Sequence, residues 1–530
     1  MDEALQLNLI ERAAVGDLLR KRARDSASVE GFIDYSSGVR RPWTFARLNA
    51  RVNRLVRGLR GLGLRQGQRL GLICGNGIDF VTSQWACFKS GIVMVPINYA
   101  QSADEVTWTL KHAGVAALIV EAPLWTAFAA ANAQLPAELP RIIAGAAPGP
   151  GFTTLESLIA GQSDAEIDDI VIDDRDVAQI MYTSGTTSKP KGVMTSHSAL
   201  LFAGFSNAIG YGYRRPFTAL SVLPQFHIAA EVAQIMTLLL GGRFVCLRGF
   251  DAARVVSIME AERVSNFVGL PMMWRAMLSV PDVNKRDYSA LQRCTYAMAT
   301  MDPEMLDRLR QTFGCPFDLP GGQTEFTPCP TIHQDGTPTE NPGANCWGMP
   351  TPVTDQAVLD DDGRELPQGR IGEICWRGPM AMNGYYRNPE ATAEVRKFGW
   401  HHSGDLGFID ACGQLQFVDR KKDIIKSGGE NVASALVEEV LLGHGGIAIA
   451  AAIGLPHPYW GEVVCAIVQP KPGVVLDEAV VLAHCRARLA GFQAPKRLVV
   501  LDVLPMTATG KIRKAELRVQ FADLFRSATV

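Results

Sequence analysis

The sequence has no CxxC pair, no surplus of basic residues and no long apolar run. Its 11 cysteines are an odd number spread over 530 residues, which argues against a disulfide framework or a zinc site and favours buried thiols in a reducing compartment. The 52 Lys and Arg residues nearly balance 54 Asp and Glu residues, so net charge draws the chain to neither nucleic acid nor anionic membrane. No window approaches the roughly 18 consecutive apolar residues of a spanning helix, and no signal core is present at the start. These absences predict a cytoplasmic protein without a nucleic-acid partner or transmembrane segment.

The chain is apolar enough to fold around a large core, with 47% hydrophobic and 20% charged residues. Short β-rich runs alternate with helical patterns, which is typical of parallel sheets covered by helices. The charged segment DRKKD at 419–423 follows a strand-like run and precedes a glycine pair, as a domain boundary does. We therefore predict an α/β protein with a large N-terminal domain of helix-covered β-sheets, 1–421, and a small α+β C-terminal domain, 422–530.

Two further stretches carry structural expectations. Residues 131–174 are looser in pattern and are predicted to form a surface excursion. Four arginines recur every three residues beside apolar positions and are expected to form the solvated face of an amphipathic helix, although they could instead contact an anionic partner. These are Arg51, Arg54, Arg57 and Arg60.

The first chemical motif is YTSGTTSKPKGV, Tyr182 to Val193, which follows a strand-like run and precedes a helical pattern from about Ser196. Backbone N–H groups, hydroxyls and ammonium groups on such a loop suit a polyphosphate. The usual P-loop places its lysine after the second glycine, whereas Lys191 precedes Gly192 here. The loop taken alone leaves a plain turn open.

The full string resembles the TSG(S/T)TGxPKG motif of the adenylate-forming superfamily, which includes acyl-CoA synthetases, aryl-CoA ligases, peptide-synthetase adenylation domains and beetle luciferases. Further motifs of this family follow in order as far as TGKIRK, while Ser188 stands where glycine is usual. The resemblance implies that the C-terminal domain is mobile, that ATP is a substrate, and that Thr186 also contacts Mg²⁺. The loop residues that it assigns to ATP are Thr183, Ser184, Gly185, Thr186, Thr187 and Lys191.

Two motifs resemble the family's acyl-binding region. LPQFH resembles LPxFH, which implies that His227 points to the carboxylate and that Phe226 forms an apolar wall. A packed core histidine is the alternative. YAMATMDP falls where the family has SGGAPL, so Ala299 is expected beside adenine and Met298 near the acyl tunnel, unless Met298 is an ordinary core residue.

GGQTE, residues 321–325, resembles the family's YGQTE. This implies that Thr324 contacts the α-phosphate and that Glu325 helps to hold Mg²⁺, a cation that prefers hard oxygen ligands. Gly322 and Gln323 are assigned to the nucleotide with them. Gly321 replaces a tyrosine whose ring lies against adenine in the family, so a stacking partner is lost unless a neighbour fills the gap. A turn with an exposed glutamate is the alternative.

Three later segments complete the nucleotide site by resemblance. WHHSGDLG implies that Asp405 accepts hydrogen bonds from the ribose hydroxyls. FVDRKKDIIKSGGENV implies that Arg420 binds nucleotide, that Lys422 is the hinge and that Lys426 approaches the phosphate, with a solvated linker as the alternative. Its glycines, Gly428 and Gly429, are expected to line the coenzyme A tunnel. In the helical pattern that follows, Glu438 and Glu439 are expected to face solvent.

LPMTATGKIRK resembles the family's PxTxTGKxxR/K and implies that Lys511 is the catalytic lysine, which pairs with the substrate carboxylate and the α-phosphate. Thr324, Glu325 and His227 are the other residues expected at the reacting groups. An exposed C-terminal lysine is otherwise an ordinary surface residue.

Together these motifs predict an ATP-dependent carboxylic acid:CoA ligase that uses Mg²⁺, forms an acyl-adenylate and pyrophosphate, and then makes an acyl-CoA thioester. We expect a medium- or long-chain fatty acid as substrate. Aryl or alicyclic acids, transfer to a carrier-protein thiol, and a non-catalytic relative are the alternatives, and a homodimer is left open.

Overall fold

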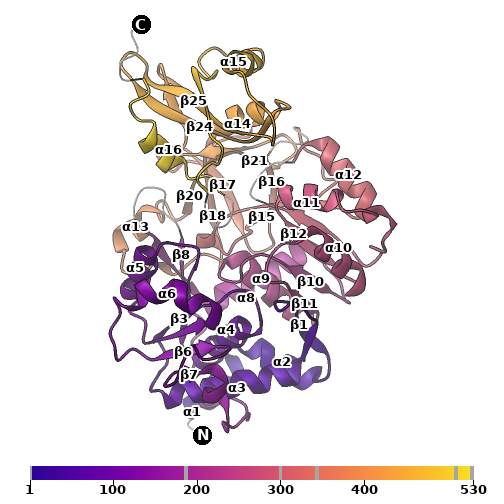
Figure 1. Cartoon of the computed structure of the whole chain (residues 1–530), viewed down its shortest axis with the longest axis vertical. Coiled ribbons are helices and arrows are strands. Elements are labelled where there is room, and N and C mark those ends of the chain that lie inside the picture. Colours follow the sequence, from indigo (N-terminus) through magenta and orange to yellow (C-terminus); the bar gives the residue numbers. More distant parts are fainter. Residues whose placement is uncertain (1–2, 184–188, 298–300, 341–344, 507–510, 526–530) are drawn as a thin grey trace.

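The computed structural model describes residues 3–183, 189–297, 301–340, 345–506 and 511–525. In Figure 1 the N-terminal half lies at the bottom, the middle of the chain at the right, and a smaller C-terminal part at the top. The described residues form three β-sheets covered by helices, so the mixed α/β class and the smaller C-terminal domain are confirmed.

The first sheet is mostly parallel, and all its strands except the edge strand β19 come from the N-terminal half. Its antiparallel pair β8–β9 leads into and out of the phosphate loop. In spatial order the strands are β19 (Gly384–Tyr385), β9 (Lys191–Ser196), β8 (Val177–Thr183), β4 (Val93–Pro96), β3 (Arg69–Ile73), β5 (Ala117–Glu121), β6 (Arg141–Ala144) and β7 (Thr153–Thr154).

The second sheet is parallel from β14 to β1 and antiparallel from β17 to β15. Its order is β17 (Asp355–Leu359), β18 (Gly372–Arg377), β20 (His401–Ile409), β21 (Leu415–Arg420), β16 (Cys346–Pro350), β15 (Thr331–His333), β14 (Phe317–Gly321), β13 (Cys294–Tyr296), β12 (Asn266–Gly269), β10 (Thr218–Ser221), β11 (Arg243–Cys246), β1 (Glu30–Asp34) and β2 (Arg41–Thr44).

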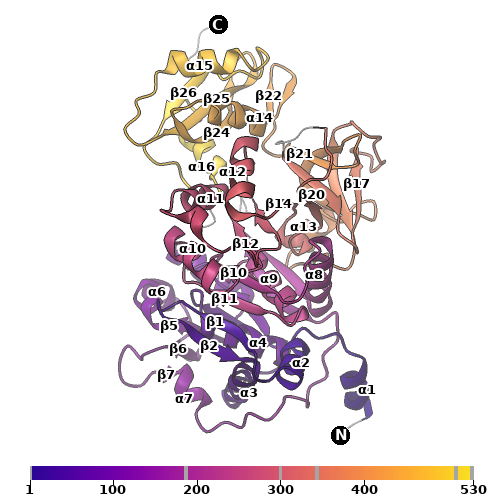
Figure 2. The same ribbon diagram turned by 90° about the vertical axis from the view of Figure 1, so that its right-hand side faces the viewer.

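The third sheet forms the C-terminal domain, above the other two in Figure 2. Its strands are β23 (Glu430–Val432), β22 (Ile425–Ser427), β25 (Gly461–Pro470), β24 (Ile447–His457) and β26 (Arg497–Val500). One face packs on α14 and α15 through Val437 and Val481, and the other on α16 through Leu517. The sheet begins just after the predicted boundary between 421 and 422, which stays a prediction.

The helices vary from single turns to 17 residues. Their bounds are α1 (Glu3–Glu11), α2 (Asp17–Asp25), α3 (Phe45–Gly61), α4 (Ile78–Ser90), α5 (Ala103–Ala113), η1 (Ala122–Leu124), α6 (Trp125–Asn132), α7 (Leu155–Ile159), α8 (His197–Gly210), α9 (Ile228–Leu239), α10 (Ala252–Ala261), α11 (Pro271–Leu278), η2 (Val283–Lys285), α12 (Pro303–Phe313), η3 (Thr324–Phe326), α13 (Pro389–Glu394), α14 (Ser434–Leu442), α15 (Glu478–Arg486) and α16 (Lys514–Gln520). Within the described ranges, no helix has both the length and the apolar character needed to span a bilayer.

The main core lies between the two N-terminal sheets. Fully buried side chains come from β3 and β11 and from three helices, and they belong to one cluster: Leu72, Phe244, Trp85 on α4, Leu200 on α8 and Ile235 on α9. Helix α8 begins where the sequence predicts, because the Ser196 hydroxyl caps it by accepting a hydrogen bond from the backbone N–H of Ala199 at 3.2 Å. This packing fixes α8, which follows the phosphate loop and β9, and α9, which follows His227.

The arginine row on α3 is not a solvated face, so that expectation is wrong. Arg51 is buried against carboxylates of α4 and α7, and the irregular segment after α7 supplies carboxylates and carbonyl oxygens to Arg54, Arg57 and Arg60. The arginines thus hold this part of the predicted surface excursion to the core, while β6 and α7 within it are regular elements. The ion pairs are Arg51 with Asp79 and Glu156 (2.8 and 2.6 Å), Arg54 with Asp164 (2.7 Å) and Arg60 with Asp169 (2.9 Å).

A second expectation fails on α14. Glu439 faces solvent as predicted, whereas Glu438 pairs with Lys514 at 2.7 Å and accepts a hydrogen bond from the backbone N–H of Ala452 at 2.8 Å. The helical pattern could not show this, because Lys514 starts α16 and is far away in the sequence. Nine cysteines are buried and all 11 thiols are free, as the spacing indicates.

Candidate active site

The phosphate loop joins two antiparallel strands. Thr183 ends β8 and Lys191 begins β9, and the two residues are paired in register, with the Thr183 hydroxyl 3.5 Å from the Lys191 carbonyl oxygen. The chain therefore leaves the sheet at β8 and re-enters it at the neighbouring strand β9. Four residues assigned to ATP, namely Ser184, Gly185, Thr186 and Thr187, lie outside the described residues, as does Ser188.

Glu325 and the phosphate-loop lysine meet at one tyrosine. The Tyr385 hydroxyl donates a hydrogen bond to Glu325 Oε1 at 3.0 Å, and the ammonium of Lys191 lies 4.8 Å from the centre of the Tyr385 ring. Burial raises the pKa of Tyr385, so its phenol remains a donor. Glu325 and Thr324 lie on η3, directly after the second sheet's β14. The sequence motifs are therefore brought together from the two N-terminal sheets.

Asp405 and Arg420 face each other on paired strands. They are register partners in β20 and β21, and Arg420 Nε lies 3.9 Å from Asp405 Oδ1. Burial raises the pKa of Asp405 to about 6, against the opposing effect of Arg420, Lys511 and Lys422. An ionised carboxylate at this position is an acceptor suited to a vicinal diol.

Lys511 comes from the C-terminal domain and lies against this same group. Desolvation, and then the charge of Arg420, lower the pKa of Lys511 to about 8, while Asp405 and Glu325 raise it. Lys511 is exposed, so solvent screens part of this effect. The predicted catalytic lysine and the predicted metal-binding and ribose-binding carboxylates thus share one site. Residues 507–510 lie outside the described ranges.

His227 borders the site from the other side. It precedes α9, and its backbone N–H donates to the carbonyl oxygen of Pro224 at 3.0 Å. Its ring atom Nε2 is buried without a hydrogen-bond partner among the described residues, and desolvation followed by the charge of Lys511 lowers the pKa of His227 to about 4. The imidazole is therefore neutral. Phe226 is buried and packs edge-on against Tyr99, with ring centres 5.2 Å apart.

The position of the missing tyrosine is occupied by another aromatic ring. A Cβ atom on Gly321 would lie 2.2 Å from the indole of Trp347, which stacks on Phe417 with ring centres 4.6 Å apart. Gly322 has a φ of +146° and packs against the Pro328 carbonyl oxygen, so glycine is required there as well. Gln323 bonds the ring of His401 at 2.8 Å. Met298 and Ala299 lie outside the described residues.

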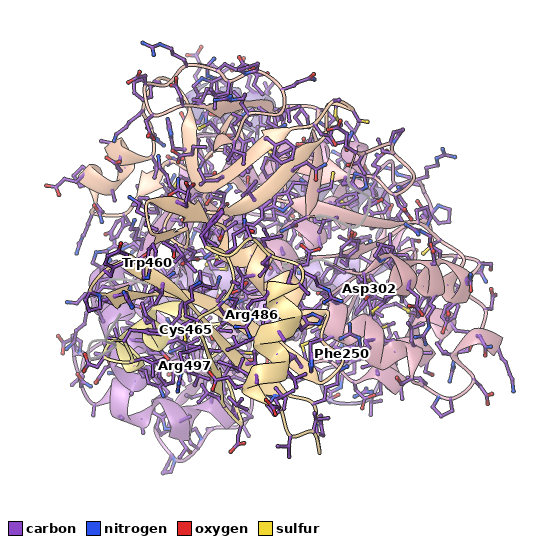
Figure 3. All side chains as sticks on the ribbon, turned by 90° about the horizontal axis from the view of Figure 1, so that it is seen from above. Phe250, Asp302, Trp460, Cys465, Arg486 and Arg497 are labelled. Atoms are coloured by element: carbon purple, nitrogen blue, oxygen red, sulfur yellow. The ribbon has the colours of Figure 1, made fainter. Side chains whose placement is uncertain are left out.

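The glycine pair of the C-terminal domain forms a hairpin between β22 and β23. Gly428 and Gly429 have φ angles of +62° and +88°, and the Gly428 N–H donates to the Trp460 carbonyl oxygen at 3.0 Å. Lys426 is exposed, and none of the hydrogen bonds or ion pairs recorded for these three residues within the described ranges reaches Asp405, Glu325 or Lys511. Seen from above in Figure 3, Trp460 lies on the opposite side of the view from Asp302 and Phe250.

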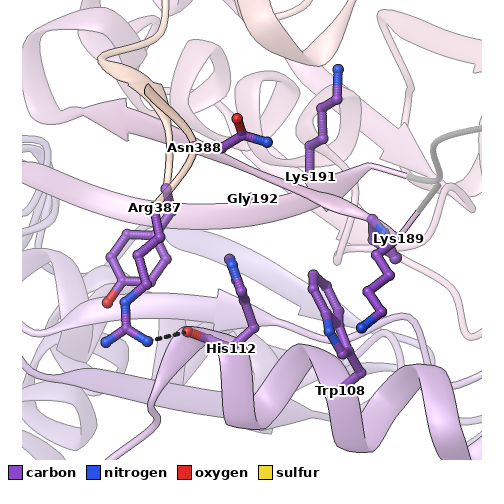
Figure 4. A pocket seen from close by; sticks show the side chains of 9 residues that line it. Trp108, His112, Lys189, Lys191, Gly192, Arg387 and Asn388 are labelled. Carbon is purple, nitrogen blue, oxygen red and sulfur yellow. Dashed lines mark hydrogen bonds between the residues drawn. The ribbon is translucent and has the colours of Figure 1, made fainter. Parts of the chain in front are cut away.

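A cationic pocket of about 280 Å³ flanks the phosphate loop on the side of α5 (Figure 4). The rings of Trp108 and His112 are stacked 4.6 Å apart, and Lys189 and Arg387 stand on either side of them. Lys191 points away from His112 in this view, towards Tyr385. The pocket therefore continues the positive charge of the phosphate loop to the protein surface.

Sequence reasoning missed Tyr385 and Trp347. Tyr385 lies in the string NGYYRN and Trp347 in NCWGM, and neither string shows which distant residue the side chain meets. The one signal for Trp347 was the absence of an aromatic residue at position 321, which left a space for another side chain to fill.

The AMP-binding enzyme family model matches residues 19–386, and the model of the AMP-binding enzyme C-terminal domain matches residues 436–511. The chain belongs to the AMP-binding enzyme family. Its relatives include a feruloyl-CoA synthase from an Amycolatopsis species, 36% identical over 90% of this chain and 94% of that protein. The long-chain-fatty-acid–CoA ligase FadD13 of Mycobacterium tuberculosis is 33% identical over 96% of this chain and 98% of that protein.

The solved structure of ATP-bound MatB from Rhodopseudomonas palustris superposes with a TM-score of 0.85 at 26% identity, covering 96% of this chain and 99% of that chain. Apo MatB from the same organism gives a TM-score of 0.75 at 27% identity, covering 97% and 100%. Family and relatives identify this chain as an ATP-dependent acid–CoA ligase.

Proposed function

We propose that this ligase activates a medium- or long-chain fatty acid and transfers it to coenzyme A. The observation that carries the proposal is the convergence of Lys511 from one domain with Glu325, Asp405 and Arg420 from the other. A carboxylate and a triphosphate are both anions, so they react only where cations offset their repulsion. Lys511 and Arg420 provide that environment.

In the first step a carboxylate oxygen of the acid forms a bond to the α-phosphorus of ATP, and pyrophosphate leaves with the electrons of the broken P–O bond. Lys511 offsets the charge on the carboxylate and the α-phosphate. Arg420 lies beside Asp405, which accepts hydrogen bonds from the ribose. The neutral ring of His227 and the wall formed by Phe226 orient the acid. The loop from Thr183 to Lys191 holds the leaving phosphates.

Mg²⁺ fits the donor set at Glu325. Its Oε1 accepts the Tyr385 hydroxyl, whereas Oε2 has no hydrogen bond within the described residues and is a hard oxygen donor. Glu325 would hold the ion together with Thr186, which lies outside the described ranges. When bound, Mg²⁺ would offset charge on the phosphate oxygens.

In the second step the thiol of coenzyme A attacks the acyl carbon, loses its proton, and displaces AMP. We propose that the C-terminal domain, 422–530, turns about Lys422 between the two steps, so that Gly428 and Gly429 line the thiol path. The backbone of these glycines supports this role, because their positive φ angles favour glycine, and glycine has no side chain to obstruct a ligand. Reorientation by a few hinge dihedrals is a common form of domain motion.

The choice of an apolar acid is supported by Phe226, whose ring packs against Tyr99 and beside the His227 ring. An aryl acid is the second candidate, because a feruloyl-CoA synthase is 36% identical. Transfer to a carrier-protein thiol is the third, because the fatty acid–[acyl-carrier-protein] ligase ScoC of Streptomyces coeruleorubidus is 32% identical over 91% of this chain and 92% of that protein.

The test is pyrophosphate release from ATP and Mg²⁺ with a panel of fatty, aryl and alicyclic acids, with and without coenzyme A, and with products identified by mass. Release that yields an acyl-CoA with C8 to C18 fatty acids supports the proposal. A preference for an aryl acid would show that the substrate is an aryl acid and not a fatty acid. Accumulation of the adenylate until a carrier protein is added would show that the acceptor is the carrier-protein thiol and not coenzyme A. Absence of release with every acid contradicts the proposal.

A further inference from the structure

A glycine on β14 and a tryptophan on β16 have complementary shapes. Residue 321 has no side chain, and the space that a side chain would enter is filled by the indole of Trp347, 2.2 Å from the position of a Cβ atom. Any larger residue at 321 would displace the ring. The large residue at 347 and the glycine at 321 are therefore a matched pair.

The indole is held in one orientation. Its Nε1 donates a hydrogen bond to Asn345 Oδ1 at 3.2 Å, and its ring is nearly parallel to that of Phe417, with an angle of 20° between them. Both rings are only partly buried, so part of this aromatic surface remains accessible. Two fixed, partly exposed aromatic rings form a flat apolar surface at little cost in side-chain entropy.

This surface adjoins the polar groups described above. Phe417 lies on β21, the strand that ends at Arg420, and β21 is hydrogen-bonded on one side to β16 and on the other to β20, which carries Asp405. The aromatic rings of β16 and β21 thus lie on strands next to Asp405 on β20, with Arg420 at the end of β21. A flat apolar surface, an acceptor carboxylate and a cation are the three kinds of group that a base, a ribose diol and a phosphate need.

We propose that Trp347, supported by Phe417, is the residue on which the nucleobase of ATP stacks, and that it replaces the side chain that Gly321 lacks. This inference rests on the proposed function, because it needs ATP to bind beside Asp405 and Arg420. It makes Trp347 a binding residue that sets affinity for the nucleotide and has no part in the chemical step.

The experiment measures ATP binding by calorimetry and the KM for ATP in four proteins: wild type, Trp347→Val, the exchanged pair Trp347→Val with Gly321→Tyr, and Trp43→Phe as a control at a distant tryptophan on β2. Stacking on an aromatic side chain contributes enough that Trp347→Val should bind ATP about 5- to 150-fold more weakly, with kcat at saturating ATP little changed. The exchanged pair should recover most of the affinity, because it returns an aromatic ring from the other strand. Trp43→Phe should bind as wild type does.

Wild-type affinity in a folded Trp347→Val protein would overturn the inference. Loss without recovery in a folded exchanged pair would also overturn it, since Trp347 would then only be holding Phe417 in place. Wild-type protein that does not bind ATP at all would contradict the proposed function instead. Thermal unfolding of each variant shows that it is folded.

Discussion

The arginines of α3 and the cations of the predicted active site, Arg420, Lys422 and Lys511, have different surroundings. On α3, arginines 51, 54 and 60 each meet at least one carboxylate in an ion pair of 2.6 to 2.9 Å. In the predicted active site, desolvation and then the charge of Arg420 lower the pKa values of Lys422 and Lys511, and the Arg420 guanidinium lies 3.9 Å from the Asp405 carboxylate. Close ion pairs fasten α3 to its neighbours, whereas cations that lie near one another suit an anionic substrate.

The largest effect is expected from a substitution of Lys511. Lys511→Gln keeps the side-chain length but removes the charge, so acid-dependent exchange of pyrophosphate into ATP should fall by about 10²- to 10³-fold. Lys471→Gln, at an exposed lysine of the same domain, is the matched control and should exchange at the wild-type rate. Undiminished exchange in Lys511→Gln would show that this lysine is an ordinary surface residue.

Substitution of the α3 arginines should lower the free energy of unfolding and leave kcat unchanged. Arg51→Ala removes the shared partner of Asp79 and Glu156 and should lower the free energy of unfolding by about 1.5–3 kcal/mol. Arg54→Ala, at a more exposed pair, should cost at most about 1 kcal/mol. Denaturant unfolding measures both, and kcat per folded molecule should remain at the wild-type value. A large loss of kcat in folded Arg51→Ala would give this row a functional role.

The adenylation rate should depend on pH through the charge of Lys511. The pKa of Lys511 is lowered to about 8, so its charge is present below that pH and is lost above it. The adenylation rate should therefore fall by up to tenfold per unit as the pH rises through about 8. Lys511→Arg should move this fall to higher pH, because a guanidinium stays charged. A profile that is flat from pH 7 to 10 in the wild type would contradict the role of the lysine charge.

The smallest expected effect concerns the hinge. Lys422→Pro fixes one backbone dihedral next to Arg420 and should slow thioester formation from preformed adenylate about tenfold, while adenylation changes less. Rapid-quench measurement of the two half-reactions distinguishes them, with Lys421→Pro as the neighbouring control. Equal losses in both half-reactions would refute the hinge assignment.

The sequence predicted the fold class and the chemistry because both depend on local patterns. Strand and helix alternation indicated the sheets, and the motifs around Glu325, Asp405 and Lys511 indicated residues that the structure brings together. It did not predict contacts that depend on pairing between distant segments. The carboxylates that cover Arg51, the Lys514 partner of Glu438 and the Trp347 ring over Gly321 all come from such pairings.

Isotope transfer tests the central claim most directly. The acid carries ¹⁸O in both carboxylate positions and reacts with ATP and coenzyme A, and the products are weighed by mass spectrometry. If a carboxylate oxygen attacks the α-phosphorus and the thiol later breaks the bond from that oxygen to the acyl carbon, AMP carries one ¹⁸O and pyrophosphate carries none. Label in a terminal phosphate, or formation of ADP, would contradict an acyl-adenylate route for this protein.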